Sequence, residues 1–285
     1  MVDLSLALTL RIFSNPVANA CQKKLGERVS SLCVNFYVSL LMSLGCIIPA
    51  FFVNWQNFSL EFWSYVFMAG LFCSLGTICL IKALHYGELS ILGPLNSYKS
   101  VVGLVSAFLL LGELPKLVAI LGVVLIVFGS LFLISPNRTN DYDAKKMWIS
   151  VGLRFVALIF TGCEASILNK IILMSSPEIS FILWCFSGFV LGGLFLIFVP
   201  KKVSIPAKSD LMKYIITAIS LSVMQFSTNI VFSKMAVAPA LALFQLSSLV
   251  NLFLGYKIFK EGNLVRKFIG TVVMILGASL ILFNK

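Results

Sequence analysis

Hydrophobic stretches of about 20 residues recur from one end of the sequence to the other, separated by short segments rich in charged and turn-forming residues. A helix of about 20 apolar residues, rising roughly 1.5 Å per residue, spans the hydrocarbon core of a bilayer. Strands of a membrane barrel would instead alternate polar and apolar side chains over about 10 residues, and the sequence lacks that alternation. We therefore predict an all-α polytopic membrane protein.

The hydrophobic pattern predicts ten transmembrane helices. Their approximate ranges are 4–23, 31–53, 62–82, 88–111, 116–135, 147–170, 178–199, 212–233, 239–258 and 264–283. The composition agrees, because 59% of the 285 residues are hydrophobic and 12% are charged, whereas a soluble domain carries roughly 25% charged residues.

The net charge of +11 does not indicate a nucleic-acid partner, because the basic residues lie in short loops and form no basic face interleaved with aromatic residues. The seven cysteines form no CxxC or CxxxC pair, so we expect reduced packing residues. Arg11, Asn15 and Pro16 interrupt the first apolar segment, and we predict no cleavable signal peptide. No cofactor and no metal site are expected.

The two halves of the sequence repeat a spaced pattern of one glutamate and two glycines. The matching residues are Glu113, Gly122 and Gly129 in the first half and Glu261, Gly270 and Gly277 in the second. Glycines seven residues apart share one face of a helix, where small residues let membrane helices approach closely. The glutamates are interpreted as loop residues near helix N-termini, where a carboxylate is favoured.

The repeat predicts two equivalent domains, 1–135 and 147–285, joined by the polar connector 136–146. Because five spans is an odd number, the second domain must enter the membrane in the opposite orientation. Such inverted five-helix repeats are typical of secondary transporters, whose substrate sites lie near the middle of the bilayer.

Each half also contains a "GE" or "EG" turn followed by a helix with spaced glycines. The segments are ALHYGELSILGPLNSYKSVVGLVSAFLLLGELPKLVAILGVVLIVFGSLFLI (83–134) and SKMAVAPALALFQLSSLVNLFLGYKIFKEGNLVRKFIGTVVMILGASLIL (233–282). With these features the chain resembles, over essentially its whole length, the EamA-type transporters of the drug/metabolite transporter (DMT) superfamily. The resemblance implies a ten-helix carrier whose central cavity is lined mainly by the first, third and fourth helices of each half.

Four charged residues fall inside predicted spans: Arg11, Lys99, Arg154 and Glu164. A charge at the centre of a membrane helix costs at least about 2.5–3.5 kcal/mol, so it should face a cavity or a partner. Lys99 lies near the middle of its span, where Gly93-Pro94 is expected to break the helix five residues earlier, and is predicted to bind substrate.

Arg11 and Glu164 fall at similar depths in the membrane, because the first and sixth spans run in opposite directions. Two interpretations of this pair stay open: a structural ion pair between the helices, or a direct part in handling substrate or protons. Arg154 is interpreted as a side chain that extends to the near interface. The small multidrug members of the superfamily use a first-helix glutamate, and this chain has Arg11, Asn15 and Asn19 there instead.

Uncharged polar residues within the spans complete the predicted site, although for each of them taken singly a hydrogen bond between helices is the favoured alternative. The candidate substrate-binding residues are Lys99, Asn15, Asn19, Asn96, Tyr98, Gln225, Asn229, Gln245 and Trp184, and the candidates for an ion pair or for coupling are Arg11 and Glu164. Broken helices near Pro94 and Pro239 are expected to expose backbone groups to this cavity.

These residues predict a secondary active transporter that moves a small metabolite by alternating access, and export is the favoured direction. Three cations against one acid inside the membrane favour an amino-acid-like zwitterion or an organic anion as substrate. The alternatives are a carrier of cationic or aromatic compounds, for drug efflux or choline-like uptake, and a non-transporting scaffold. No enzyme is expected, because the chain has one histidine, no HExxH motif and no clustered carboxylates.

The expected partners are a small-molecule substrate and the lipid bilayer of the plasma (bacterial inner) membrane, with protons as a candidate coupling ion and a monomer or loose homodimer as the assembly. The Lys and Arg residues are concentrated in the odd-numbered loops, which the positive-inside rule places in the cytoplasm. Both termini would then lie outside, whereas relatives are usually drawn with cytoplasmic termini.

Overall fold

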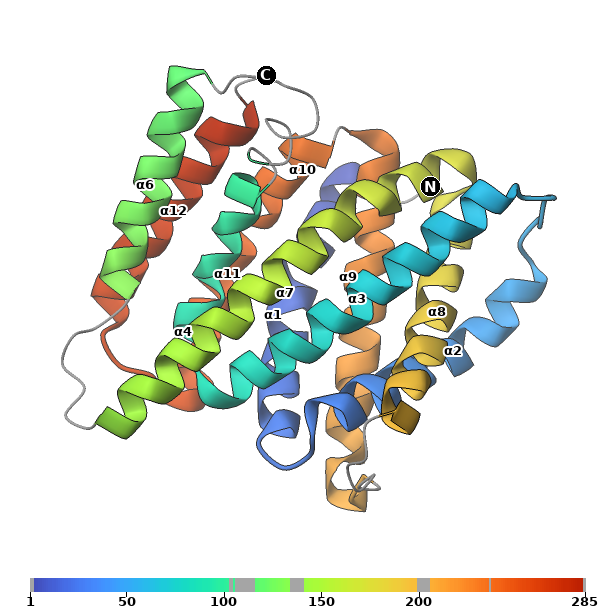
Figure 1. The fold of residues 1–285 in the computed structure, drawn as a ribbon, viewed down its shortest axis with the longest axis horizontal. Coiled ribbons are helices and arrows are strands. Elements are labelled where there is room, and N and C mark those ends of the chain that lie inside the picture. The colour runs from blue at the N-terminus through green and yellow to red at the C-terminus, as the bar shows by residue number, and fades with distance from the viewer. Residues whose placement is uncertain are drawn as a thin grey trace.

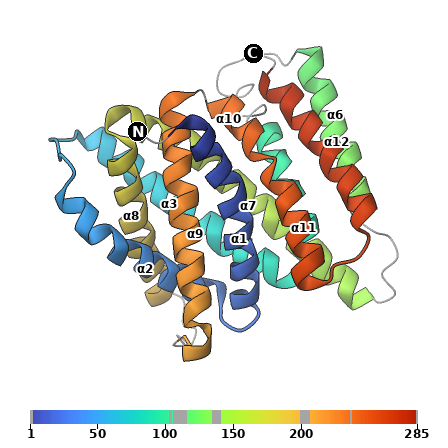
Figure 2. The same ribbon diagram turned by 180° about the vertical axis from the view of Figure 1, so that it is seen from behind.

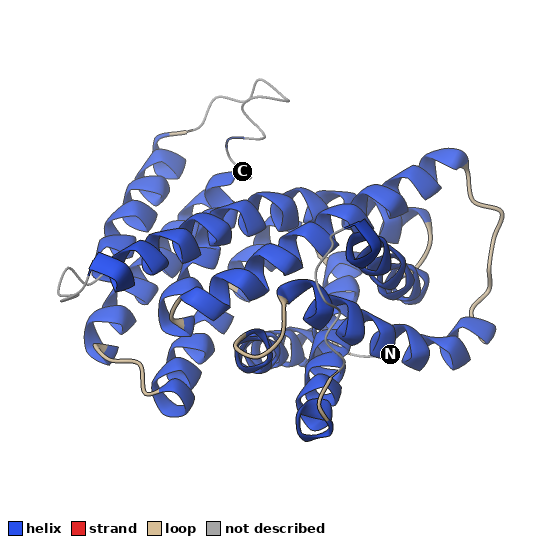
Figure 3. Ribbon diagram, turned by 60° about the horizontal axis from the view of Figure 1, so that its bottom comes forward, coloured by secondary structure: helices blue, strands red, loops and turns tan. Residues whose placement is uncertain are grey.

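The computed structural model describes residues 3–102, 105, 116–133, 141–198, 206–235 and 237–283, and these residues contain helices and loops but no strand (Figure 3). The helices are α1 (Leu4–Gly26), α2 (Ser31–Phe51), α3 (Leu60–Tyr86), α4 (Leu89–Leu92), η1 (Pro94–Ser97), α6 (Leu117–Leu133), α7 (Asp141–Met174), α8 (Pro177–Phe198), η2 (Lys208–Asp210), α9 (Leu211–Lys234), α10 (Val237–Phe244), α11 (Ser247–Phe259) and α12 (Leu264–Phe283). The predicted all-α class is confirmed. Glu113, part of the fourth predicted span and residues 136–140 of the connector lie outside the described residues.

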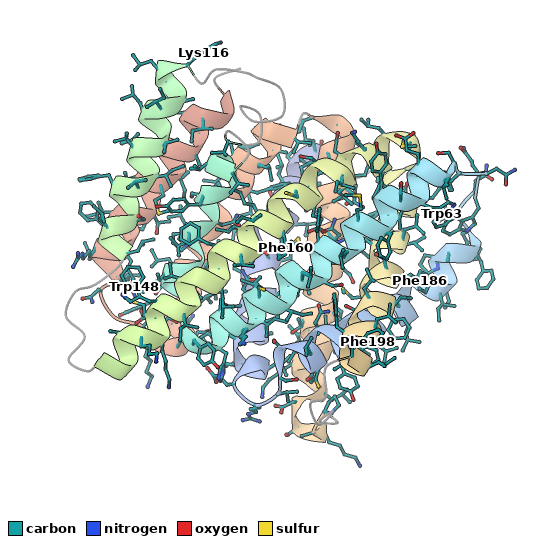
Figure 4. The ribbon with its side chains drawn as sticks, in the orientation of Figure 1. Trp63, Lys116, Trp148, Phe160, Phe186 and Phe198 are labelled. Atoms are coloured by element: carbon teal, nitrogen blue, oxygen red, sulfur yellow. The ribbon has the colours of Figure 1, made fainter. Side chains whose placement is uncertain are left out.

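Seven helical segments in the described ranges are long and apolar enough to cross a bilayer, and α6 is a shorter apolar helix of 17 residues. Their outer surfaces carry large apolar side chains, among them Trp63, Trp148 and Phe198, which are labelled in Figure 4. Phe198 is 78% exposed, which water would disfavour and lipid would not. The chain is therefore an integral membrane protein.

The helices pack in pairs that join distant parts of the sequence. Helix α3 lies along α7 and α6 lies beside α12, whereas α1 lies along α9 (Figures 1 and 2). Helix α2 packs on α8. Each of these pairs combines one helix from before residue 136 with one from after it, so the two halves of the sequence are interleaved rather than separate bodies.

The repeated glycines lie where α6 and α12 touch. A Cβ atom on Gly122 would lie 2.6 Å from the carbonyl oxygen of Gly277, and one on Gly277 would lie 2.6 Å from the carbonyl oxygen of Gly122. Gly129 and Gly270 face each other in the same way. The prediction that these glycines allow close helix packing is confirmed, and the two repeated motifs turn out to pack against each other.

Two helix breaks lie next to each other in the middle of the bundle. After α4 ends at Leu92, the 3-10 turn η1 follows and residues 98–102 are helical again. The second break, between α10 and α11, lies at residues 245–246. This corrects the expected break at Pro239, which falls inside α10, and Pro16 likewise lies inside the continuous helix α1.

Glu261 lies in the loop between α11 and α12 and caps α4, not the helix that follows it. Its carboxylate accepts hydrogen bonds of 2.8 Å from the backbone N–H groups of Leu89 and Ser90. Lys23, at the end of α1, donates to Glu261 at 2.7 Å and to the carbonyl oxygen of Gly87 at 2.9 Å. The predicted position of Glu261 near a helix N-terminus is confirmed, and its contacts tie α1, α4 and the α11–α12 loop together.

Candidate functional site

A cavity of about 140 Å³ lies inside the bundle, between α1, α3, α7, α8, α9, α10 and the segment that follows α4. Its lining includes the predicted residues Arg11, Asn15, Asn19, Asn96, Lys99, Glu164, Trp184 and Gln225. Pockets for drug-sized ligands measure roughly 300–1,000 Å³, so this cavity suits a smaller molecule.

Lys99 reaches the cavity from the helical residues that follow η1. Its side chain is half-buried, and its ammonium group has no hydrogen-bond or ion-pair partner among the described residues. The charges of Glu164, Arg154 and Arg11 all act on Lys99, but none of them forms a direct contact with it. The ammonium group is therefore free to contact a ligand in the cavity.

Arg11 is held by one edge of its guanidinium group. Its Nε donates a hydrogen bond of 2.9 Å to the hydroxyl of Thr228, and the group lies 4.7 Å from the centre of the Phe244 ring, a cation–π contact. Nη1 is buried and has no acceptor in the described part of the chain. A buried donor without an acceptor costs about 1–3 kcal/mol, so Arg11 is well placed to gain from an anionic ligand.

Glu164 is 8% exposed and lies on α7. Its Oε1 accepts a hydrogen bond of 2.8 Å from the indole N–H of Trp184, which comes from α8. No cation of the described residues lies within 4 Å of the carboxylate, so the structure does not contain the Arg11–Glu164 ion pair that one interpretation of the sequence proposed. Trp184 lines the cavity and also orients the only carboxylate among the described residues of its lining.

The interpretation of Arg154 as an interfacial side chain is wrong. Arg154 is 7% exposed, and its Nε donates to the carbonyl oxygen of Leu92 at 3.0 Å while Nη2 donates to Asn96 Oδ1 at 3.1 Å. In a continuous α-helix the amide of Asn96 would occupy the Leu92 carbonyl. Here that amide bonds to Gly93 instead, so the helix break frees a carbonyl group and Arg154 satisfies it.

Polar side chains also connect the two helix breaks. Asn96 Nδ2 donates to Gln245 Oε1 at 3.1 Å, and the Ser248 hydroxyl donates to the carbonyl oxygen of Gly93 at 3.2 Å. Asn19 Nδ2 donates to Asn251 Oδ1 at 3.3 Å. These bonds fix the broken segments relative to each other at the side of the cavity.

Three predicted residues lie outside the lining of the cavity. Gln245 is fully buried and contacts Asn96. Asn229 is also fully buried, accepts from Gln225 at 3.0 Å and donates to the carbonyl oxygen of Pro177 at 3.1 Å. Tyr98 is directed to α6, where its hydroxyl is 3.1 Å from that of Ser130. In this conformation they bind other helices, as the alternative interpretation of each allowed.

The cavity also contains polar residues that the sequence prediction missed, namely Gln22, Thr77, Thr161 and Thr228. Gln22 had a recognisable signal. Arg11, Asn15, Asn19 and Gln22 follow one another at intervals of three or four residues and so form one polar stripe on α1. The threonines had none, because a threonine in a membrane helix commonly bonds to its own backbone, as Thr161 and Thr228 do here.

The bundle, its apolar exterior and its charged internal cavity define a polytopic membrane protein with a polar internal cavity. Residues 10–135 match the sequence model of the EamA-like transporter family, which confirms, over that part of the chain, the resemblance to EamA-type transporters of the DMT superfamily. The match indicates a membrane transporter of the DMT type, acting on a small-molecule substrate in a lipid bilayer.

Among curated proteins, none matches this sequence. A solved structure whose title reads "Crystal structure of protein" is similar to this chain with a TM-score of 0.62, over 95% of this chain and 96% of its own. The two sequences are 10% identical, so the likeness is one of fold.

Proposed function

We propose that this protein is a secondary active transporter that moves a small amino-acid-like zwitterion or organic anion through the central cavity by alternating access. The observation that carries the proposal is Lys99, a lysine in the cavity whose ammonium group has no partner among the described residues. A charge inside the membrane region is costly unless a partner or water compensates it. An anionic group of the substrate would supply that partner.

The balance of charge around the cavity also favours an anionic group. Among the described residues, the lining contains the cations Arg11, Lys99 and Arg154 and the single carboxylate Glu164. A carrier of cationic compounds would have to bring a further positive charge into a cavity whose lining already has a net positive charge. We therefore favour the anionic or zwitterionic class over cationic drugs.

The proposed architecture is a pair of inverted five-helix repeats, residues 1–135 and 147–285, joined by the connector 136–146. It is supported by the helix pairs of the bundle. If α1, α2, α3 and α6 correspond to α7, α8, α9 and α12, a two-fold operation exchanges the pair α1–α9 with α7–α3. The same operation maps the pairs α2–α8 and α6–α12 onto themselves. Such a relation is the usual basis of alternating access.

Flux into proteoliposomes tests the proposed function. Transport of radiolabelled amino acids and organic acids should be lost in Lys99→Met, which removes the charge but keeps an apolar side chain of similar reach. Lys116→Met is the matched control, because Lys116 is exposed at the start of α6 and away from the cavity (Figure 4). Undiminished flux in Lys99→Met, at the same amount of reconstituted protein, would contradict the role of Lys99.

A further inference from the structure

The charged groups of the cavity differ in how far the protein itself satisfies them. Arg154 is committed to the Leu92 carbonyl and to Asn96, so its charge holds the broken helix. Arg11 uses one nitrogen on Thr228, and Lys99 uses none. Glu164 receives a neutral indole N–H and no cation within 4 Å among the described residues. Two cations and one carboxylate therefore remain to be matched from within the cavity.

These three groups come from three different helical segments. Arg11 belongs to α1, Lys99 to the helical residues after η1, and Glu164 to α7, and all three line the same cavity of about 140 Å³. Because they surround one small space, a single molecule can contact all three groups. Two anionic groups of that molecule would pair with the two cations, and one cationic group would pair with the carboxylate.

We propose that the substrate is an amino dicarboxylate, with its two carboxylates on Lys99 and Arg11 and its ammonium group on Glu164. This inference rests on the proposed function and narrows its substrate class. A monocarboxylic amino acid would leave one of the two cations unmatched, and a simple dicarboxylate would leave Glu164 unmatched. Both omissions are costly for the buried groups Glu164 and Arg11, because a buried charged group that loses its partner keeps its desolvation penalty.

Three four-carbon probes separate these possibilities. Aspartate has two carboxylates and an ammonium group, asparagine replaces one carboxylate with an amide, and succinate lacks the ammonium group. The short carbon chain suits a cavity well below the roughly 300 Å³ of drug-sized pockets. Calorimetric titration of the purified protein in nanodiscs should give aspartate an affinity about tenfold or more above that of either other probe, as expected for the loss of one charge-assisted bond.

Variants assign each preference to a residue. Glu164→Gln should abolish the preference for aspartate over succinate and retain the preference for aspartate over asparagine. Of Lys99→Met and Arg11→Met, the one that contacts the side-chain carboxylate should lose the preference for aspartate over asparagine. The other should weaken binding of both amino acids. Lys116→Met should leave all three affinities unchanged.

The wild-type comparison can overturn the inference even if a variant fails to fold. If asparagine or succinate binds as tightly as aspartate, the amino-dicarboxylate class is wrong while the proposed carrier of zwitterions or organic anions stands. If the protein binds none of the three probes and also transports no other amino acid or organic acid, both the inference and the proposed function fail.

Discussion

At the scale of the residue, the charges inside this protein fall into two groups with different tasks. Arg154 and Glu261 satisfy backbone groups left open where the fourth helical segment begins and breaks. Lys99 and Arg11 keep unused donors at the cavity. Both kinds of charge cost free energy to bury. Substitutions in the first group should reduce stability, because backbone groups lose their partners. Substitutions in the second group should reduce ligand binding.

Replacing Arg154 tests its structural task. Arg154→Met leaves the Leu92 carbonyl without its donor, and an unsatisfied buried acceptor costs about 1–3 kcal/mol. The variant should therefore melt at a lower temperature than the wild type in detergent, whereas Lys116→Met should not. Arg154→Lys keeps the positive charge but presents its donors from one nitrogen, whereas Arg154 uses two separate nitrogens for Leu92 and Asn96, so this variant should be intermediate. Unchanged melting of Arg154→Met would show that the carbonyl finds another donor.

The ionisation of Glu261, in the α11–α12 loop, should make the stability of the protein depend on pH. Burial favours its neutral form, but the charge of Lys23 and the hydrogen bonds from Lys23 and Ser90 outweigh this and lower the pKa of Glu261 below its ordinary value of 4.5. A lowered pKa means that the stabilisation is complete above about pH 4.5 and is lost as the pH falls through the folded-state pKa.

The melting temperature of the wild type should therefore fall as the pH drops below about 4.5. In Glu261→Gln the melting temperature should already be lower at neutral pH, because Lys23 keeps a buried charge without its partner. The melting temperature of the variant should also change less between neutral and acid pH. If the melting temperatures of the two proteins fell in parallel with pH, Glu261 would not be the cause of the acid dependence.

At the scale of the element, close contact of helices depends on the absence of side chains at defined positions. Helix α6 and helix α12 touch through Gly122 and Gly277 and through Gly129 and Gly270. At each of these glycines an added Cβ would lie within 2.8 Å of a backbone carbonyl oxygen of the other helix. A carbonyl group of a helix cannot rotate away as a side chain would. Association within the membrane relies on such packing, since lipid is as apolar as the helix surface.

Gly277→Ala should destabilise the protein, because its Cβ would lie 2.6 Å from the Gly122 carbonyl oxygen and force the helices apart. Overpacking of this kind costs about 1–3 kcal/mol. Gly152→Ala is the matched control in α7, since a Cβ there meets nothing within 4 Å. It should be neutral or mildly stabilising, because alanine is the better helix former. Thermal unfolding of both variants in the same detergent makes the comparison.

At the scale of the whole molecule, positive charge is concentrated at one end of the bundle. Lys23, Arg28, Lys260 and Lys267 lie at or near the loops at that end, and Figure 1 shows that α1 begins and α12 ends at the opposite side. We propose that the basic end faces the cytoplasm, following the positive-inside rule.

A reporter fused to the C-terminus tests this orientation. Alkaline phosphatase, which folds outside the cytoplasm, should be active at that position, and green fluorescent protein, which fluoresces when folded in the cytoplasm, should be dark. The reverse pattern would place the basic end outside. The same reporters after residue 262, in the α11–α12 loop where Gly262 is unobstructed, should give the opposite readings.

The sequence by itself determined the class of the protein, most helix positions and the identity of the unusual residues. Apolar runs long enough to span a bilayer have few other uses, so the membrane class follows from length and composition. Lys99 was evident because a charged side chain in an apolar span is costly unless it faces a cavity or a partner. The glycine faces followed from a spacing of seven residues on a helix.

The tertiary structure alone decided which of these groups face one another. Helical periodicity fixes the faces of a helix but not its rotation or its neighbours. Arg11 and Glu164 therefore appeared as candidate partners at similar depths, although Thr228 and Trp184 are the residues that they contact. Arg154 could be understood only with the break after Leu92 in view, because the carbonyl that it satisfies is free only when the helix is interrupted.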